Sequence, residues 1–165
     1  PIRDTILKLN NGTSFNEMPD AHILEKEIDL VENCRKIVLD TLNNLIIKYG
    51  QDLKNEQWVL EPYADMVISF SVMNLGFIRY NQMEDSNKKN YTLSILRCSL
   101  YRHLEVIVSK AKYINNYVYD EIVALDINES IDASIKSLNW YVDVVSLEKT
   151  IFETLSKYNG KYYLD

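Results

Sequence analysis

Hydrophobic residues recur at helical spacing through most of this chain, and short polar segments divide them into separate helices. The first helix carries two neighbouring hydrophobic rows, a face broad enough to pack against two other helices. One row is Ile23, Leu30, Cys34, Ile37, Thr41 and Leu45, and the other is Leu24, Ile28, Val31, Val38, Leu42 and Ile46. Pro19 and Asp20 are typical of a helix start and Gly50 of a helix end, so they bound this helix.

A second helix is expected to follow the polar segment after Gly50. Asn55 is a good N-cap for this helix, and Glu56 then lies in its first turn. Its expected inward row is Leu60, Ala64, Val67 or Ile68, Val72, Leu75 and Ile78. Pro62 lies within the pattern, where a proline removes a backbone donor at a cost of about 3 kcal/mol. The helix therefore either kinks at Pro62 or begins at Glu61.

A third helix and a broken fourth one complete the pattern. The third helix has the inward row Leu93, Leu96, Leu100, Leu104, Ile107, Ala111 and Ile114 and is expected to end near Tyr119. Asp126 and Glu129 match a capping box, which predicts a further helix start just before Ile131. The β-branched segment Val142–Val145 interrupts the helical rhythm. Asp143 or Ser146 can then cap a last segment with Leu147, Ile151, Leu155 and Tyr158 inward, ending at Gly160.

These patterns predict an all-α fold, an antiparallel up-and-down bundle of four helical layers whose last helix is broken near Val142–Val145. Residues 1–20 lack clean periodicity and contain turn residues, so we interpret them as a linker from an upstream domain. Residues 21–165 then form one helical bundle domain of ordinary size. The chain starts at Pro1 rather than at a methionine, which favours an excised part of a longer polypeptide.

Composition and charge bear on the classes of partner. The 165 residues carry a formal net charge of −6. Nucleic-acid binding needs clustered Lys and Arg, so we expect no nucleic-acid partner. No segment has the roughly 20 consecutive apolar residues of a membrane span, and the polar faces are mixed or acidic, so we expect no membrane docking. Cys34 and Cys98 lie among apolar residues and are interpreted as core side chains rather than as a disulfide, which favours a cytoplasmic location.

Few residues are candidates for catalysis or metal binding. His22 and His103 have no acidic or histidine partner at the spacing of a zinc site or a triad, so we interpret both as surface or half-buried side chains. A di-iron site in a helical bundle needs Glu-x-x-His motifs, and the sequence has none. The carboxylates of the second helix, Glu56, Glu61 and Asp65, therefore do not indicate such a site.

Asp65 is the charged residue that stands inside an apolar run. We expect it to pair with Arg97 or Arg102, or to accept hydrogen bonds from a neighbouring helix, because an unpaired buried carboxylate would be too costly. The plentiful tyrosines fit either a core margin or a protein interface. They are Tyr101, Tyr113, Tyr117, Tyr119, Tyr141, Tyr158, Tyr162 and Tyr163. We predict no catalytic, cofactor-binding or metal-binding residue in this chain.

Three short motifs in one order carry a resemblance to a known family. Lys48-Tyr49-Gly50 ends a helix, Asn55-Glu56-Gln57 restarts one, and Ala64-Asp65-Met66 leads into an apolar helix. This order resembles the C-terminal helical extension of the large, very-long-chain type acyl-CoA dehydrogenases and their long bacterial relatives. Glu25-Lys26-Glu27 and the tyrosine-rich segment 157–163 are similar to the bacterial members, so the resemblance covers roughly residues 24–163. Pro62 departs from the family's pattern.

The resemblance implies a structural and assembly role inside a larger enzyme. The full-length enzyme would use FAD to oxidise a fatty acyl-CoA between Cα and Cβ, with the flavin and the catalytic base in upstream domains. This chain would then be non-catalytic, and its partners would be those upstream domains, with a homodimer as one assembly that the resemblance allows. The alternative is a stand-alone helical protein-interaction module with no enzymatic activity, in which an apolar helix face serves a protein partner.

Overall fold

Five α-helices and one short 3₁₀ helix make up the regular structure of the described part of the chain. The computed structural model describes residues 24–83 and 86–157, and none of these residues is in a strand. The elements are α2 (Glu25–Tyr49), η2 (Gly50–Asn55), α3 (Gln57–Asn81), α4 (Ser86–Val118), α5 (Glu121–Ser137) and α6 (Val144–Lys157). The expected helix start at Pro19 and Asp20 lies outside the described residues.

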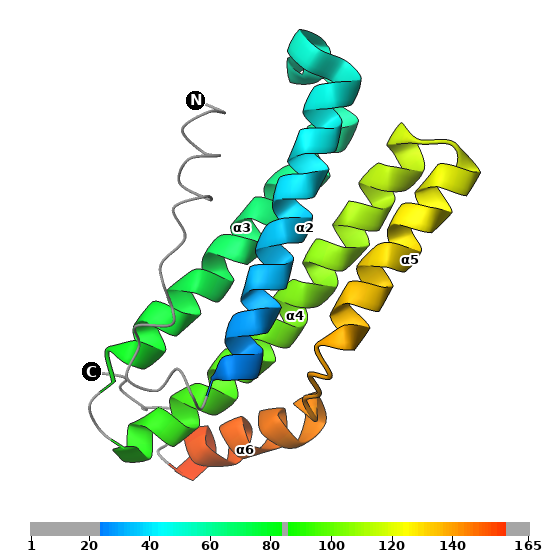
Figure 1. Cartoon of the computed structure of the whole chain (residues 1–165). Helices are drawn as coiled ribbons and strands as arrows, with labels where there is room; N and C mark the ends of the chain where they lie inside the picture. The colour runs from blue at the N-terminus through cyan, green and yellow to red at the C-terminus, as the bar shows by residue number, and fades with distance from the viewer. Residues whose placement is uncertain (1–23, 84–85, 158–165) are drawn as a thin grey trace.

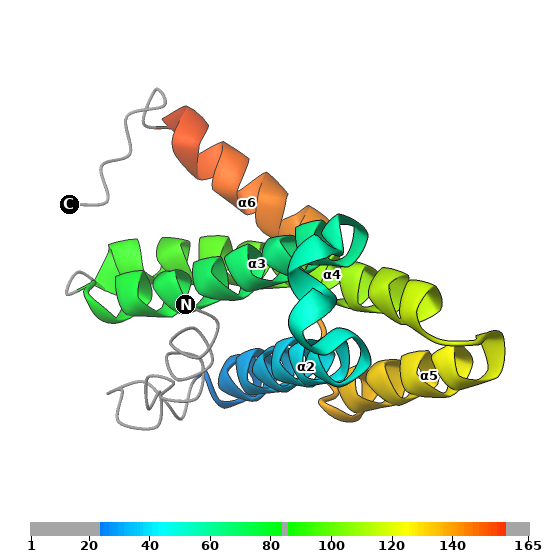
Figure 2. The same ribbon diagram turned by 90° about the horizontal axis from the view of Figure 1, so that it is seen from above.

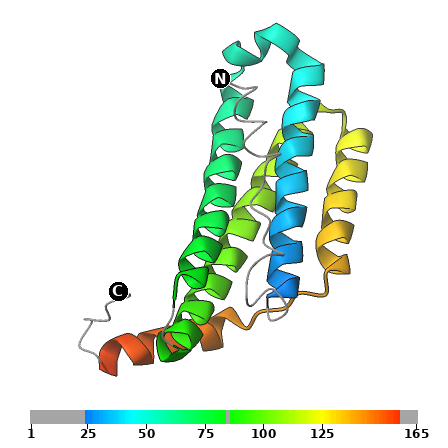
Figure 3. The same cartoon turned by 60° about the vertical axis from the view of Figure 1, so that its left-hand side comes forward.

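Helices α2 to α5 run alternately up and down and pack side by side as a bundle (Figure 1). Seen from above, α2 and α5 lie on one side of α3 and α4, and α6 lies on the other side (Figure 2). Helix α6 crosses the base of the bundle and packs mainly against α4 (Figure 3). The predicted all-α antiparallel bundle is confirmed, and so is the break before its last helix, because α5 ends at Ser137 and α6 begins only at Val144.

The two hydrophobic rows predicted for the first helix face the core in the described residues, and Ile23 at the start of the first row lies outside them. The buried apolar residues at and within α2 are Leu24, Ile28, Leu30, Val31, Cys34, Ile37, Val38, Leu42 and Leu45. Ile46, at the end of the second row, is 36% exposed. A two-row face lets α2 contact α3, α4 and α5 at once, while α4 contacts all four of the other α-helices.

Helix α3 buries a different row from the one that the sequence predicted. Pro62 and Ser69 are buried, and the other buried residues form a row with alternating spacing of four and three positions, namely Val59, Tyr63, Met66, Phe70, Met73, Phe77 and Tyr80. The predicted inward row is therefore wrong, since Ile68 is 60% exposed, Leu75 is 61% exposed and Ile78 is 38% exposed. The helix is apolar on most sides, and the row with the larger aromatic and methionine side chains is the one that fills the core.

The start of α3 also differs by a small amount from the expectation. Glu56 rather than Asn55 takes the N-cap position, and Pro62 is a buried residue inside the helix, so a start at Glu61 is wrong. Further along, α3 comes very close to α4 at Gly76. A Cβ atom added to Gly76 would lie 2.8 Å from Cδ1 of Leu96, so only a glycine fits this contact without a shift of the neighbouring side chain.

The inward row predicted for α4 is confirmed. Leu96, Leu100, Leu104, Ile107, Ala111 and Ile114 are buried, and Leu93 is partly buried against the same core. Helix α4 ends at Val118, next to the predicted end at Tyr119. An ion pair with a buried acid joins α4 to α2, because Nε of Arg97 donates to Oε1 of Glu27 at 2.7 Å and Glu27 is only 3% exposed.

The cap predicted at Asp126 is wrong. Asp126 and Glu129 lie inside α5, whose N-cap is Asp120, and Oδ1 of Asp120 accepts a hydrogen bond from the backbone N–H of Val123 at 3.0 Å. The preceding turn at Asp120 ends α4, so no second start is needed six residues later. For α6 the predicted alternative Asp143 is confirmed as the capping side chain, since its Oδ1 accepts from the backbone N–H of Ser146 at 3.1 Å.

Candidate functional site

A second hydrophobic row runs along the outer side of α3, opposite the row that fills the core. We call it the α3 outer face, and it consists of Trp58, Glu61, Asp65, Ile68, Val72, Leu75 and Arg79. These residues alternate by three and four positions, which is the spacing of a helix–helix seam in a coiled coil. Trp58 is 67% exposed, and Ile68 and Leu75 are 60% and 61% exposed. The bundle therefore leaves a seam of coiled-coil spacing open to its surroundings.

Charged residues stand at the two ends of the α3 outer face. Glu61 lies in the N-terminal part of α3, and Arg79 lies in its last turn, where a positive charge interacts favourably with the helix dipole. Asp65 is tied sideways to α4, because its Oδ2 lies 2.9 Å from Nζ of Lys110. The hydrogen bond and charge of Asp65 raise the pKa of Lys110 above its usual value. Arg97 and Arg102 are therefore wrong as partners of Asp65, and the alternative expectation, a hydrogen bond from a neighbouring helix, is confirmed.

A shallow pocket lies beside the N-terminal end of the α3 outer face. This pocket has a volume of about 370 Å³ and is lined by Trp58, Glu61, Pro62, Ser109, Lys110 and Tyr113. Tyr113 is 50% exposed and Trp58 is 67% exposed, so two aromatic rings are accessible on adjacent helices. Aromatic side chains with one apolar and one polar end are enriched at protein interfaces.

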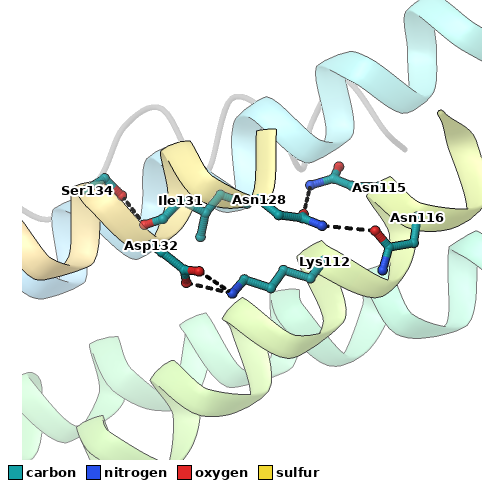
Figure 4. A network of polar contacts seen from close by, with 7 residues as sticks. All are labelled: Lys112, Asn115, Asn116, Asn128, Ile131, Asp132 and Ser134. Atoms are coloured by element: carbon teal, nitrogen blue, oxygen red, sulfur yellow. Dashed lines mark hydrogen bonds and ion pairs between the residues drawn. The ribbon is translucent and has the colours of Figure 1, made fainter. Parts of the chain in front are cut away.

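A polar network joins α4 to α5 (Figure 4). Nζ of Lys112 lies 2.6 and 2.7 Å from the two carboxylate oxygens of Asp132. Nδ2 of Asn115 donates to Oδ1 of Asn128 at 3.0 Å, and Nδ2 of Asn128 donates in turn to Oδ1 of Asn116 at 2.9 Å. Asn115 is only 3% exposed, so its pairing holds a polar group inside the bundle. This network fixes the position of α5 along α4.

A polar cleft of about 440 Å³ opens between α2 and α5 beside this network. Its lining residues are Asn33, Lys36, Ile37, Asp40, Thr41, Asn44, Asn115, Ile127, Ser130, Ile131 and Ser134. Across the cleft, Oγ of Ser134 donates to Oδ1 of Asn33 at 3.2 Å and also lies 2.8 Å from the carbonyl oxygen of Ile131. No histidine or cysteine is among these lining residues. The cleft offers amide and hydroxyl groups together with the charged side chains of Lys36 and Asp40.

Of the two histidines, the structure describes only His103. His22 lies outside the described residues, and His103 is half-buried on α4, as predicted. Burial lowers the pKa of His103 below its usual value of 6.5. Its Nδ1 atom is buried and has no hydrogen-bond partner in the described structure, so no neighbouring acid prepares this ring for proton transfer.

Both cysteines are free and buried, which confirms their interpretation as core side chains. Cys34 is 0% exposed, and burial raises the pKa of its thiol to about 12, so its nucleophilic thiolate form is strongly disfavoured. Cys98 is 7% exposed, and burial also raises the pKa of its thiol. Residues 24–83 and 86–157 contain no cluster of three His, Cys, Asp or Glu side chains that could hold a metal ion.

The tyrosines divide between the two expected settings. Tyr113 and Tyr117 are each 50% exposed and Tyr141 is 85% exposed, whereas Tyr101 and Tyr119 are partly buried. The cluster of Tyr158, Tyr162 and Tyr163 lies outside the described residues. The sequence analysis did not predict the α3 outer face. The signal that could have indicated it is that Glu61, Asp65 and Arg79 fall in one row of three-and-four spacing with exposed hydrophobic residues of the same helix.

Comparison with known proteins gives no relative from which a function could be transferred. The chain matches no protein-family model, and neither curated proteins nor solved structures give a significant match. In the described part of the chain, every helix is too short or too polar to cross a lipid bilayer. The site must therefore be interpreted from its own chemistry.

Proposed function

We propose that this chain is a non-catalytic helical docking domain that binds a protein surface through the α3 outer face. The observation that carries the proposal is the exposure of Ile68 and Leu75, at 60% and 61%, within a row that has the spacing of a helix–helix seam. Single exposed hydrophobic residues are normal on protein surfaces, but an aligned row suited to receive another helix is a feature of binding surfaces.

The inner side of α3 strengthens this proposal. Seven residues of the inner row already fill the core, so the fold has no need of the outer row for its own packing. A buried helix of a larger protein is hydrophobic on several sides for the same reason, since each side meets a different neighbour. Helix α3 has this character, and among the described elements it packs mainly through its inner side, against α2 and α4, which supports a partner on the outer side.

The resemblance to large acyl-CoA dehydrogenases supplies one specific context for this docking. In that context the partner is the catalytic part of the same polypeptide, which binds FAD and oxidises the acyl-CoA, while this chain contributes structure and assembly. The parent reading frame tests it, because a frame without upstream dehydrogenase domains leaves only the stand-alone interaction module. The free thiols of Cys34 and Cys98 support a reducing, cytoplasmic compartment for either context.

A capture experiment tests the docking function. The protein is immobilised as the wild type, as the double variant Ile68→Glu/Leu75→Glu, and as the control Ile122→Glu. Ile122 is a matched control because it is an isoleucine on α5 that is 74% exposed. We expect proteins captured from cells of the source organism, and quantified by mass spectrometry, to bind the wild type and the control but not the double variant. Equal recovery on all three folded proteins would refute the role of the α3 outer face.

A further inference from the structure

We propose that the partner at the α3 outer face is a second copy of this chain, bound so that the two α3 helices pack antiparallel about a two-fold axis. This inference rests on the proposed docking function and names its partner. A two-fold homodimer requires a self-complementary surface. If residue i of the first copy contacts residue j of the second, residue j of the first copy also contacts residue i of the second. The order of residues along the α3 outer face meets this requirement.

The hydrophobic positions define the register of the pairing. In an antiparallel pair of seams with alternating three-and-four spacing, a residue at one type of position faces the other type on the partner helix. Placing Ile68 opposite Val72 of the second copy also places Val72 opposite Ile68, with the two-fold axis level with residue 70. Ile68 is 60% exposed and Val72 is half-buried at the surface, so both are accessible to a second helix.

The charged ends of the seam agree with the same register. With Ile68 opposite Val72, Glu61 of each copy faces Arg79 of the other. Two ion pairs would then form, one at each end of the apolar part of the interface. A parallel pairing would instead place Glu61 against Glu61 and Arg79 against Arg79. Like charges in direct opposition are destabilising, so the charge pattern selects the antiparallel arrangement.

The neighbouring elements leave room for this arrangement. Helices α2 and α4 pack against α3, and α6 packs mainly against α4. Trp58, Ile68 and Leu75 of the α3 outer face are exposed, and Asp65 and Val72 are half-buried. Asp65 would face Leu75 of the second copy, and its charge is already balanced by Lys110 at 2.9 Å. The ion pair with Lys110 therefore means that the Asp65 carboxylate would not be an unpaired charge in the dimer interface.

Sedimentation over a range of protein concentrations provides the first test. We expect the full chain to associate from monomer to dimer, the variant Ile68→Glu to remain a folded monomer, and the control Ile122→Glu to associate as the wild type does. Circular dichroism verifies that each variant keeps its helices. A wild-type chain that remains monomeric at every concentration, or an Ile68→Glu chain that dimerises like the wild type, would overturn the inference.

A charge-exchange experiment tests the register itself. In Glu61→Arg dimers both ends would carry two arginines, and in Arg79→Glu dimers both ends would carry two glutamates. Each single variant should therefore dissociate with a constant raised by about tenfold. An equimolar mixture of the two variants should associate as tightly as the wild type, because every end of the mixed dimer again has opposite charges. A mixture no tighter than its components would rule out this antiparallel register.

The outcomes separate this inference from the proposed function on which it rests. In one outcome, sedimentation shows only monomer while a protein is captured by the wild type and not by Ile68→Glu/Leu75→Glu. That result would support the docking function and refute the second copy as the partner. If the captured protein is the chain itself and the charge-exchanged mixture recovers wild-type affinity, both are supported. Equal capture by all variants together with a monomeric wild type would remove both.

Discussion

Truncation of Leu100 to alanine tests the packing of α4 against the rest of the bundle. Leu100 is 0% exposed and lies in the middle of the inward row of α4, so removal of its side chain leaves a cavity that the surrounding helices fill only in part. Large-to-small substitutions of this kind lower the free energy of unfolding by about 2–5 kcal/mol, through lost transfer energy and through the cavity itself. That is a large fraction of the roughly 5–15 kcal/mol that stabilises an ordinary domain.

The assay is thermal unfolding followed by circular dichroism, with Ile68→Ala as the matched control. For a chain of this size, a loss of about 2–5 kcal/mol lowers the melting temperature by about 4–20 °C. Ile68 is 60% exposed, so its truncation should change stability by no more than about 0.5 kcal/mol. Alanine also has the higher helix propensity, which offsets part of any loss.

Protein concentration must be kept low in these melts, because association through Ile68 would itself stabilise the native state. Under dilute conditions, equal drops in melting temperature for Leu100→Ala and Ile68→Ala would refute the assignment of inner and outer sides. A lower melting temperature for Ile68→Ala but not for Leu100→Ala would show that Ile68 is the buried residue and Leu100 the exposed one.

Three further outcomes are expected. Burial lowers the pKa of His103 from 6.5, so the unfolded chain takes up a proton at higher pH than the folded one, and the associated stability falls as pH drops below 6.5. His103→Gln should therefore lose less stability to acid than the wild type, measured as urea midpoints at about pH 7.5 and pH 5.5. Asp120→Ala removes the N-cap of α5 and should lower the free energy of unfolding by about 1 kcal/mol in urea titrations. Cys34, 0% exposed, should react with a thiol reagent only after unfolding, as labelling of a Cys98→Ser variant would show; prompt reaction in the native state would contradict its burial.

The sequence predicted the helices well where polar and apolar sides are clearly separated. In α4 the row from Leu93 to Ile114 alternates with charged residues such as Arg102 and Glu105, so only one side can be buried. In α3 almost every side is apolar, and two rows have similar spacing. Periodicity then gives the helix but not its rotation, because side-chain size and the neighbouring helices decide which row is buried.

The error at α5 has a different physical origin. Asp126 and Glu129 have the right spacing for a capping box, but a cap forms only where a preceding turn leaves backbone N–H groups without partners. That turn lies at Asp120, next to the end of α4, and its position depends on where α4 meets α5 in space. The α3 outer face was hidden for a related reason, since no local pattern states which apolar row lacks a neighbour.

Helix α6 is packed less tightly against the rest of the protein than the four helices of the bundle are. It packs mainly against α4, and none of its residues is fully buried. Cooperative folding units that bury little surface open at a lower free energy than the whole domain. Amide hydrogens of α6 should thus exchange with solvent while those of α2 and α4 remain protected, so the protein can release one end of its chain and keep a native core.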